Sequence, residues 1–528
     1  MSVPSALVPQ PVEVIPAPGS FTLPTDAAVS GPPAWTAVVR RLLGPGTGLT
    51  LPDRPDGAIA VRQDQTIPPE GYRLRVRGEG IEISAADERG VNWAVQTLRQ
   101  LLPAGVFRPA PTTDHWQVPA IDITDAPRFG WRGVMLDVAR HFMPLADLYG
   151  LIDLLAMHKY NTLHLHLSDD QGWRMESRTH PRLHQVGSTR HQTRRPGEDG
   201  DGTPHGGYYT QDQLRSLVAY ARQRGIDVVP ELDFPGHVRA VLAAYPELGN
   251  DPGAEHQPAD EFGIFDEVLN LSDESVDFAF SVFGELLEIF PSAYIHGGGD
   301  ECPRTEWLAS PTADELARQR GLPDATHLQR WFTERLRDWL TERGRTLVGW
   351  DEINTEGHLA GAVTMAWRDQ DYGVKAAQAG GAVVMAPCSH LYFDYYASAD
   401  DREPYSIGGH TPIEKVYGYD PLDGVPEAAR ERILGTQAQV WTEYMPTMSR
   451  VQYQLFPRAC AHAEVAWSQP QGRTWGAFRP RLEAHLERLA ALGVNYRPLE
   501  GPHPWQQGGT GAFQRPAAHR QGDGAATA

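Results

Sequence analysis

The segment Tyr294-Ile-His-Gly-Gly-Gly-Asp-Glu301 joins a short strand-like run to a glycine turn and two adjacent carboxylates, Asp300 and Glu301. Adjacent carboxylates repel each other and need solvent or a partner, so they contribute little to a packed core. In a parallel barrel the chemistry follows the carboxyl ends of the strands, where this pair would lie. The pair also fits the first turn of a helix, where acidic side chains are favoured. The rest of the chain distinguishes these two interpretations.

Eight short apolar segments follow one another from about residue 128 onward, and each is typical of a buried strand in a parallel sheet. They span residues 133–138, 162–167, 226–232, 293–296, 347–350, 362–367, 382–386 and 435–441. Amphipathic segments, such as residues 145–158 and 210–224, lie between several of them. The region 126–505 is therefore predicted to be an α/β domain, a (β/α)8 TIM barrel.

Residues 1–125 have a different pattern, in which short alternating strands are separated by Pro and Gly. Residues 71–76 and 80–84 are examples, and residues 90–102 have the apolar spacing of a helix. This pattern predicts a small α+β domain in front of the barrel. Residues 506–528 are rich in Gly, Ala, Gln and Arg, and we expect them to form a disordered tail.

The composition narrows the class of ligand. The chain has 528 residues and a formal net charge of -20, which disfavours nucleic acid and anionic membranes as partners. Its 14 Trp suit a neutral, polyhydroxylated ligand, because indole faces stack on the C–H faces of sugar rings, although they also fit a large core.

The three Cys are widely spaced and form no metal-ligand pattern. The N-terminus lacks the features of a signal peptide, so we expect a cytoplasmic protein, or a secreted one if a leader was removed.

Polar and aromatic residues follow nearly every predicted strand. Arg140 follows the first strand, where its guanidinium could hold two vicinal hydroxyls or form a surface ion pair. His237 follows a Pro-Gly turn and could tune nearby carboxylates or serve as a structural histidine. Trp350, Trp367 and Trp441 end three later strands, and each precedes an acidic residue within two positions. This arrangement favours a lined pocket with hydrogen-bonding groups at its rim.

A metal site is an alternative at the second strand. His164 and His166 share one face of that strand and are followed by Asp169, which is typical of a metal site at a barrel mouth. The chain has no H-E-x-x-H motif, and its later strands offer few further histidines. A metal-dependent hydrolase would lose activity on chelation, and insensitivity to chelators would exclude it.

Taken together, these strand ends resemble glycoside hydrolase family 20, the β-N-acetylhexosaminidases, in their bacterial form. The resemblance rests on motifs in the same order at residues 137–142, 164–173, 231–237, 296–301, 349–352, 441–443 and 456–459. The small N-terminal domain is also similar to the one that precedes the barrel in that family. Two positions differ from the usual pattern. Gly297 stands where an aliphatic residue is common, which should loosen the packing under the carboxylate pair, and Leu165 stands where many members have Trp.

The resemblance implies an exo-acting, retaining enzyme that removes terminal N-acetylglucosamine or N-acetylgalactosamine without metal or cofactor. Its mechanism would be substrate-assisted, with an oxazolinium intermediate formed by the acetamido group of the sugar. Glu301 would be the general acid. Asp300 would accept the acetamido N–H, and Tyr392 would bind the acetamido oxygen. A sugar-binding relative without activity remains an alternative, although it should have lost the acid, and Glu301 is present.

The resemblance also implies which other side chains surround the sugar. Trp350, Trp367 and Trp441 would wall the pocket, and Arg140, Asp394 and Glu443 would bind the outer hydroxyls, while Asp169 and His237 would form a pair that supports Glu301. The partner would be an oligosaccharide or glycoconjugate that ends in N-acetylhexosamine, such as a chitin fragment. A homodimer would be consistent with the family.

Overall fold

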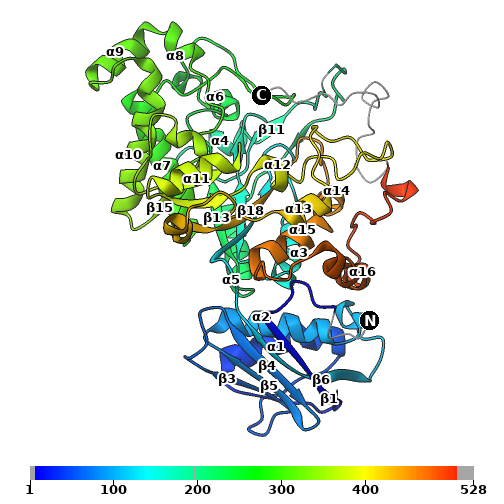
Figure 1. Cartoon of the computed structure of the whole chain (residues 1–528). Helices are drawn as coiled ribbons and strands as arrows, with labels where there is room; N and C mark the ends of the chain where they lie inside the picture. Colours follow the sequence, from blue (N-terminus) through cyan, green and yellow to red (C-terminus); the bar gives the residue numbers. More distant parts are fainter. Residues whose placement is uncertain (1–5, 196, 508–528) are drawn as a thin grey trace.

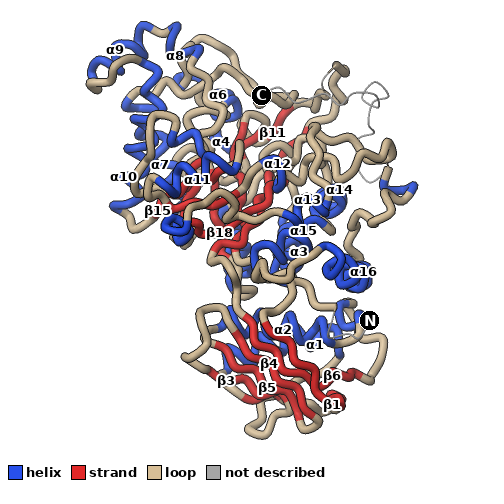
Figure 2. Tube along the Cα trace, in the orientation of Figure 1, coloured by secondary structure: helices blue, strands red, loops and turns tan. Residues whose placement is uncertain are grey.

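The small N-terminal domain is built on one six-stranded sheet. The computed structural model describes residues 6–195 and 197–507 (Figure 1). The strand order is β1-β6-β4-β5-β3-β2. The bounds are β1 (Glu13–Leu23), β2 (Val29–Ser30), β3 (Ile59–Gln63), β4 (Tyr72–Arg77), β5 (Gly80–Ala85) and β6 (Trp116–Asp125). Helices α1 (Pro33–Thr47) and α2 (Glu88–Leu101) cover one face, so the domain has two layers (Figure 2).

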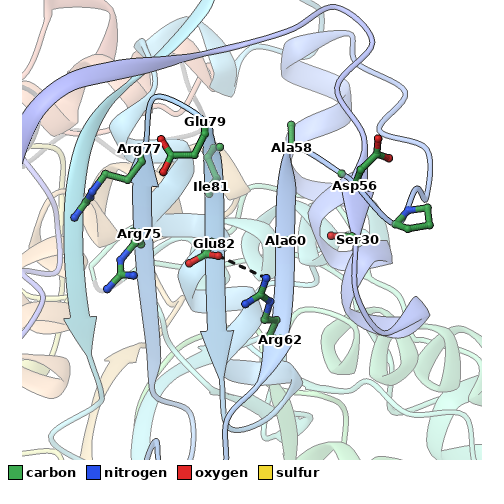
Figure 3. A pocket seen from close by; sticks show the side chains of 13 residues that line it. Ser30, Asp56, Ala58, Ala60, Arg62, Arg75, Arg77, Glu79, Ile81 and Glu82 are labelled. Atoms are coloured by element: carbon green, nitrogen blue, oxygen red, sulfur yellow. Dashed lines mark ion pairs between the residues drawn. The ribbon is translucent and has the colours of Figure 1, made fainter.

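The other face of this sheet is charged and open to solvent. A surface hollow of about 590 Å³ lies over β3, β4 and β5, and Figure 3 shows the charged side chains that line it. Arg62 and Glu82 form an ion pair of 3.6 Å across two of these strands, and Arg75 pairs with Asp122 at 3.1 Å. Exposed ion pairs of this kind contribute little to stability.

Eight parallel strands form a closed barrel in the order β13-β14-β15-β16-β17-β18-β7-β8. Their bounds are β7 (Trp131–Asp137), β8 (Thr162–His166), β13 (Asp227–Glu231), β14 (Tyr294–His296), β15 (Thr346–Trp350), β16 (Val363–Ala366), β17 (Ala382–Met385) and β18 (Ile433–Val440). All eight predicted strands are present, which confirms the predicted fold class. The register places Asp137, His166, Glu231 and His296 at one level at the carboxyl end of the barrel.

Helices that follow the barrel strands along the chain pack around the barrel domain. They are α3 (Leu145–Met157), α5 (Gln211–Arg222), α7 (Asp273–Ile289), α10 (Leu328–Glu342), α11 (Gln370–Gln378), α15 (Arg458–Trp467) and α16 (Trp475–Ala491). The predicted helices at 145–158 and 210–224 correspond to α3 and α5. Thr210 caps α5 through a capping box with Gln213, which explains where that helix begins.

The loops that follow the strands carry the remaining short elements. These are β9 (Ser168–Asp169), β10 (Gly172–Trp173), α4 (Arg182–Gln185), β11 (Thr189–Arg190), β12 (His205–Gly206), α6 (Arg239–Ala244), α8 (Thr305–Ala309), α9 (Pro311–Gln319), α12 (Cys388–Leu391), α13 (Ile413–Gly418) and α14 (Met448–Leu455). The single-turn helices are η2 (Ala104–Phe107), η3 (Pro246–Leu248), η4 (Ala325–His327), η5 (Asp351–Asn354), η6 (Glu427–Arg432) and η7 (Pro504–Gln506).

A buried charge joins the small domain to the barrel. Asp125, the last residue of β6, accepts hydrogen bonds from Lys159 Nζ at 2.7 Å, Tyr72 Oη at 2.7 Å and Trp467 Nε1 at 2.9 Å. Lys159 and Asp125 are both fully buried, so losing either would leave an unpaired charge in the interface. The two domains are therefore fixed relative to each other.

The C-terminal region differs in part from the expectation. Gln506, the first residue of the predicted tail, is buried in η7 and donates to Asn495 Oδ1 at 2.7 Å. Residues 508–528, which make up the rest of the predicted tail, lie outside the described residues. None of the helices in the described ranges has the length and apolarity that a bilayer crossing requires.

Candidate active site

The glycine turn after β14 places the two carboxylates at the barrel mouth. Gly298 and Gly299 both have positive φ, and a Cβ at Gly298 would lie 1.8 Å from Asp233 Oδ1. The turn approaches Asp233 so closely that Gly299 N donates to the same oxygen at 2.9 Å. Glu301 has φ +45°, a conformation that is strained for any residue except glycine and is found mostly at functional sites. The next helix begins only at Thr305, so the helix-start interpretation of the pair is wrong.

Asp300 lies in a buried group of acids. Its Oδ1 has no hydrogen-bond partner among the described residues. Burial and the adjacent Asp233 carboxylate raise the pKa of Asp300 well above its usual value, and burial raises the pKa of Asp233 to about 7. Oxygens of the two carboxyl groups lie within 4.8 Å of each other, so ionisation of one disfavours ionisation of the other.

Glu301 is the accessible member of the pair. Its side chain is 34% exposed, and its Oε2 lies 3.7 Å from His237 Nε2. On the other side of the ring, His237 Nδ1 lies 2.9 Å from Asp170 Oδ2 and 3.4 Å from Asp169 Oδ1. Although burial lowers the pKa of His237, Asp169 and Asp170 raise it well above its usual value. The predicted contact between His237 and Asp169 is present, and Asp170 is a second, closer acid at the same ring nitrogen.

Asp169 is also the partner of Arg140. Its Oδ2 lies 2.8 Å from Arg140 Nη2 and 3.0 Å from His166 Nε2. Arg140 also donates from Nε to Gln171 Oε1 at 3.0 Å, and its guanidinium lies 4.9 Å from the ring centre of Trp441. The alternative of a surface ion pair for Arg140 is wrong, because the side chain is buried.

Two further acids lie near Arg140 with unpaired oxygens. Asp394 Oδ1 and Glu443 Oε2 are buried and have no hydrogen-bond partner within the part of the chain that the structure describes. Burial and Glu443 raise the pKa of Asp394 well above its usual value. Burial raises the pKa of Glu443 to about 7, although Arg140 lowers it. Buried acceptors of this kind are costly unless a ligand supplies donors.

The predicted aromatic residues converge on one wall. Trp350 and Trp441 are 5.7 Å apart between ring centres, and Tyr392 stacks on Trp367 at 5.9 Å. Carboxylates hold the rings at both ends of this wall, since Trp350 Nε1 donates to Glu231 at 2.8 Å and Trp367 Nε1 donates to Glu352 at 3.0 Å. Trp350 is fully buried and Trp367 is partly exposed. The wall therefore extends from the barrel interior to the surface.

Arg458 is a supporting residue to which sequence reasoning gave no role. It is buried and donates to the backbone oxygens of Phe393 at 2.5 Å and Tyr395 at 3.0 Å, which are the residues on either side of Asp394. It also donates to Thr411 Oγ1 at 2.7 Å, and that hydroxyl donates to the backbone oxygen of Tyr392 at 2.9 Å. Arg458 thus fixes the loop that carries Tyr392 and Asp394. The signal was present in the Phe456-Pro-Arg-Ala motif, but its partners are distant in sequence.

The three residues of the alternative metal site, His164, His166 and Asp169, do not form one cluster. His164 stacks on His296 at 4.5 Å and lies with Glu231, whereas Asp169 lies with Asp170 and His237. His166 stands between Glu231 and Asp169 and contacts both. His164, His166 and Asp169 therefore do not converge as the metal alternative requires.

The space around Gly297 is filled. A Cβ at Gly297 would lie 2.9 Å from Leu336 Cδ2 and 2.9 Å from Leu347 Cδ1. The expectation of looser packing under the carboxylates is wrong, because these two leucines occupy the volume that a larger residue would take.

Comparison with known proteins gives the family. Residues 129–470 match the model "Glycosyl hydrolase family 20, catalytic domain", and residues 4–126 match "Glycosyl hydrolase family 20, domain 2". The chain is 40% identical over 471 residues to a β-hexosaminidase of Porphyromonas gingivalis, which covers 88% of this chain but only 59% of that protein. It is 36% identical over 437 residues to a β-hexosaminidase of Akkermansia muciniphila, which covers 81% of this chain and 86% of that protein.

Solved structures agree with these sequence matches. A family 20 exo-β-N-acetylglucosaminidase of Vibrio harveyi, solved with N-acetylglucosamine, superimposes with a TM-score of 0.84 at 33% identity and covers 94% of this chain and 78% of that one. The N-acetyl-β-hexosaminidase of Streptomyces plicatus superimposes with a TM-score of 0.83 at 30% identity and covers 95% of this chain and 98% of that one. The chain belongs to glycosyl hydrolase family 20 and is therefore a glycoside hydrolase.

Proposed function

We propose that the chain is an exo-acting, retaining β-N-acetylhexosaminidase that uses the acetamido group of its substrate as the nucleophile. The observation that carries this proposal is a set of buried carboxylate oxygens that lack donors, namely Asp300 Oδ1, Asp394 Oδ1 and Glu443 Oε2. Each such acceptor costs about 1–3 kcal/mol or more while it is unpaired. A sugar that presents one N–H and several hydroxyls supplies the missing donors.

The acid pair suits substrate-assisted chemistry. The acetamido N–H would donate to Asp300 while the acetamido carbonyl oxygen attacks the anomeric carbon and the bond to the leaving oxygen breaks. The acetamido N–H would favour the ionised form of Asp300, which accepts the hydrogen bond and stabilises the developing positive charge. This role needs no enzyme nucleophile, which separates the mechanism from that of most retaining glycosidases.

Glu301 would move the proton in both steps. It protonates the leaving oxygen as the glycosidic bond breaks, and its carboxylate then removes a proton from the water that opens the intermediate. Its contact with His237, which Asp170 holds in turn, fixes the carboxyl group at the edge of the site. Its greater exposure fits this role, because the leaving group and the water both arrive from the solvent side.

The closed side of the site supports exo action. Arg140, Asp394 and Glu443 are all buried, whereas Glu301 is accessible. A terminal sugar would place its outer hydroxyls against the buried residues and its glycosidic bond toward Glu301. A further sugar unit attached at those hydroxyls would have to enter among these buried side chains. The relatives from V. harveyi and S. plicatus were both solved with N-acetylglucosamine, which supports this sugar as a ligand.

The stereochemistry of hydrolysis tests the proposal. When a chitin oligosaccharide is hydrolysed and followed by proton NMR from the first seconds, we expect the β-anomer of N-acetylglucosamine to appear before the α-anomer. We also expect the monosaccharide to be released stepwise from the non-reducing end. Early α-anomer would show an inverting reaction, and early release of longer fragments would show endo action. Either result would contradict the proposed function.

A further inference from the structure

Glu231 receives four contacts beneath the proposed sugar site. It ends β13, and its side chain is fully buried. Its Oε1 accepts from Trp350 Nε1 at 2.8 Å and lies 2.9 Å from His296 Nδ1. Its Oε2 lies 3.0 Å from His164 Nε2 and accepts from His166 Nδ1 in a short contact. Glu231 thus links the inner wall of the pocket to three neighbouring strands.

His166 connects this acid to a second one. Its Nδ1 contacts Glu231 Oε2, and its Nε2 lies 3.0 Å from Asp169 Oδ2, the oxygen that also contacts Arg140. Because both ring nitrogens face carboxylates, the arrangement favours the imidazolium form, in which each nitrogen donates to one acid. Although burial lowers the pKa of His166, Glu231 and Asp169 raise it well above its usual value. The ring edge also packs on Trp441 at 5.0 Å.

We propose that His166 is a positioning residue, a buried cation that holds both ends of the sugar site at once. Through Glu231 it fixes Trp350 on the proposed acetamido side. Through Asp169 it fixes Arg140 on the side of the outer hydroxyls. The inference rests on the proposed function for the identity of the two sides, but the chain of contacts itself is independent of it.

The two ends are separable by substitution. In His166→Asn the side-chain amide nitrogen lies near the position of Nδ1, so it can keep the contact with Glu231 but not the contact with Asp169. In His166→Gln the amide nitrogen lies near the position of Nε2 and has the opposite effect. A residue that only fills space would not distinguish these two variants.

The readout is a pair of affinity ratios rather than activity. Calorimetry or competition binding gives the affinity for N-acetylglucosamine, for its 4-deoxy analogue and for glucose. His166→Asn should reduce the preference for N-acetylglucosamine over the 4-deoxy sugar on the order of tenfold, because Arg140 loses its fixed position. His166→Gln should leave the preference over the 4-deoxy sugar unchanged. It should reduce the preference for N-acetylglucosamine over glucose by a similar factor.

A matched control and a second pair of variants make the test decisive. His485 is also fully buried, but it contacts His158 and Arg488 away from the site, so His485→Asn should lower Tm and change neither ratio. If the His166 variants do not fold, two other variants replace them. Asp169→Asn should reduce the preference for N-acetylglucosamine over the 4-deoxy sugar, and Glu231→Gln should reduce the preference for N-acetylglucosamine over glucose. Equal changes in both ratios, or no change in either, would overturn the inference. Failure of the unmodified protein to prefer N-acetylglucosamine would instead contradict the proposed function.

Discussion

Glu301→Gln is expected to lower kcat/KM for substrates with poor leaving groups about 10²- to 10⁴-fold, because the amide cannot protonate the departing oxygen. The loss should shrink as the leaving group becomes more acidic, since a stable phenolate departs without a proton. The measurement is kcat/KM for a series of aryl N-acetyl-β-glucosaminides, plotted against the pKa of the phenol. We expect the variant to depend much more steeply on that pKa than the unmodified enzyme.

Glu352→Gln is the matched control for this experiment. Glu352 is a nearby carboxyl group whose pKa is raised to about 8, mainly by burial, but its side chain faces Trp367 Nε1 rather than the leaving group. Its removal should not steepen the dependence on leaving-group pKa. A Glu301→Gln variant that loses the same factor on every aryl substrate would show that Glu301 is not the acid.

Asp300→Asn is expected to lower kcat about 10²- to 10³-fold, the loss typical of removing one group that stabilises transition-state charge. The amide can still accept a hydrogen bond, but it carries no negative charge to balance the charge that develops on the acetamido group. The substrate in its ground state has no such charge, so KM should change much less. Asp300→Ala, which removes the acceptor as well, should lose at least as much.

Binding of a thiazoline analogue of the cyclic intermediate separates this role from simple substrate binding. The analogue resembles the charged intermediate, so its affinity should fall with kcat/KM in the Asp300 variants, while the affinity for N-acetylglucosamine falls less. Equal losses for the two ligands would mean that Asp300 binds the sugar but does not stabilise the reacting state.

The barrel was predictable because its strands are buried on both faces. Such strands appear in the sequence as short apolar runs with polar ends, and all eight were visible in this form. The carboxyl ends of parallel strands meet on one side of a barrel, so residues as distant as Arg140 and Glu443 could be assigned to one site. The position of a residue after a strand was therefore sufficient to place it near the mouth.

Which side chains contact each other within the site was less predictable from the sequence. Asp169 and Asp170 are adjacent, and both carboxylates contact the same nitrogen of His237, at 3.4 Å and 2.9 Å. The position of Asp169 after a strand predicts an acid near His237, but it does not show that its neighbour contacts the same ring. Arg458 binds backbone oxygens, which carry no sequence signal. The packing at Gly297 likewise depends on leucines that a local motif does not show.

Acetamido participation is the central claim, and one comparison tests it most directly. The rates of hydrolysis of an aryl N-acetyl-β-glucosaminide and of the matching aryl β-glucoside are measured with the same leaving group. We expect turnover of the first and none of the second, because the glucoside carries no carbonyl oxygen to attack the anomeric carbon and the proposed site supplies no substitute. Equal turnover of both would show that a group of the enzyme acts as the nucleophile and would contradict the mechanism.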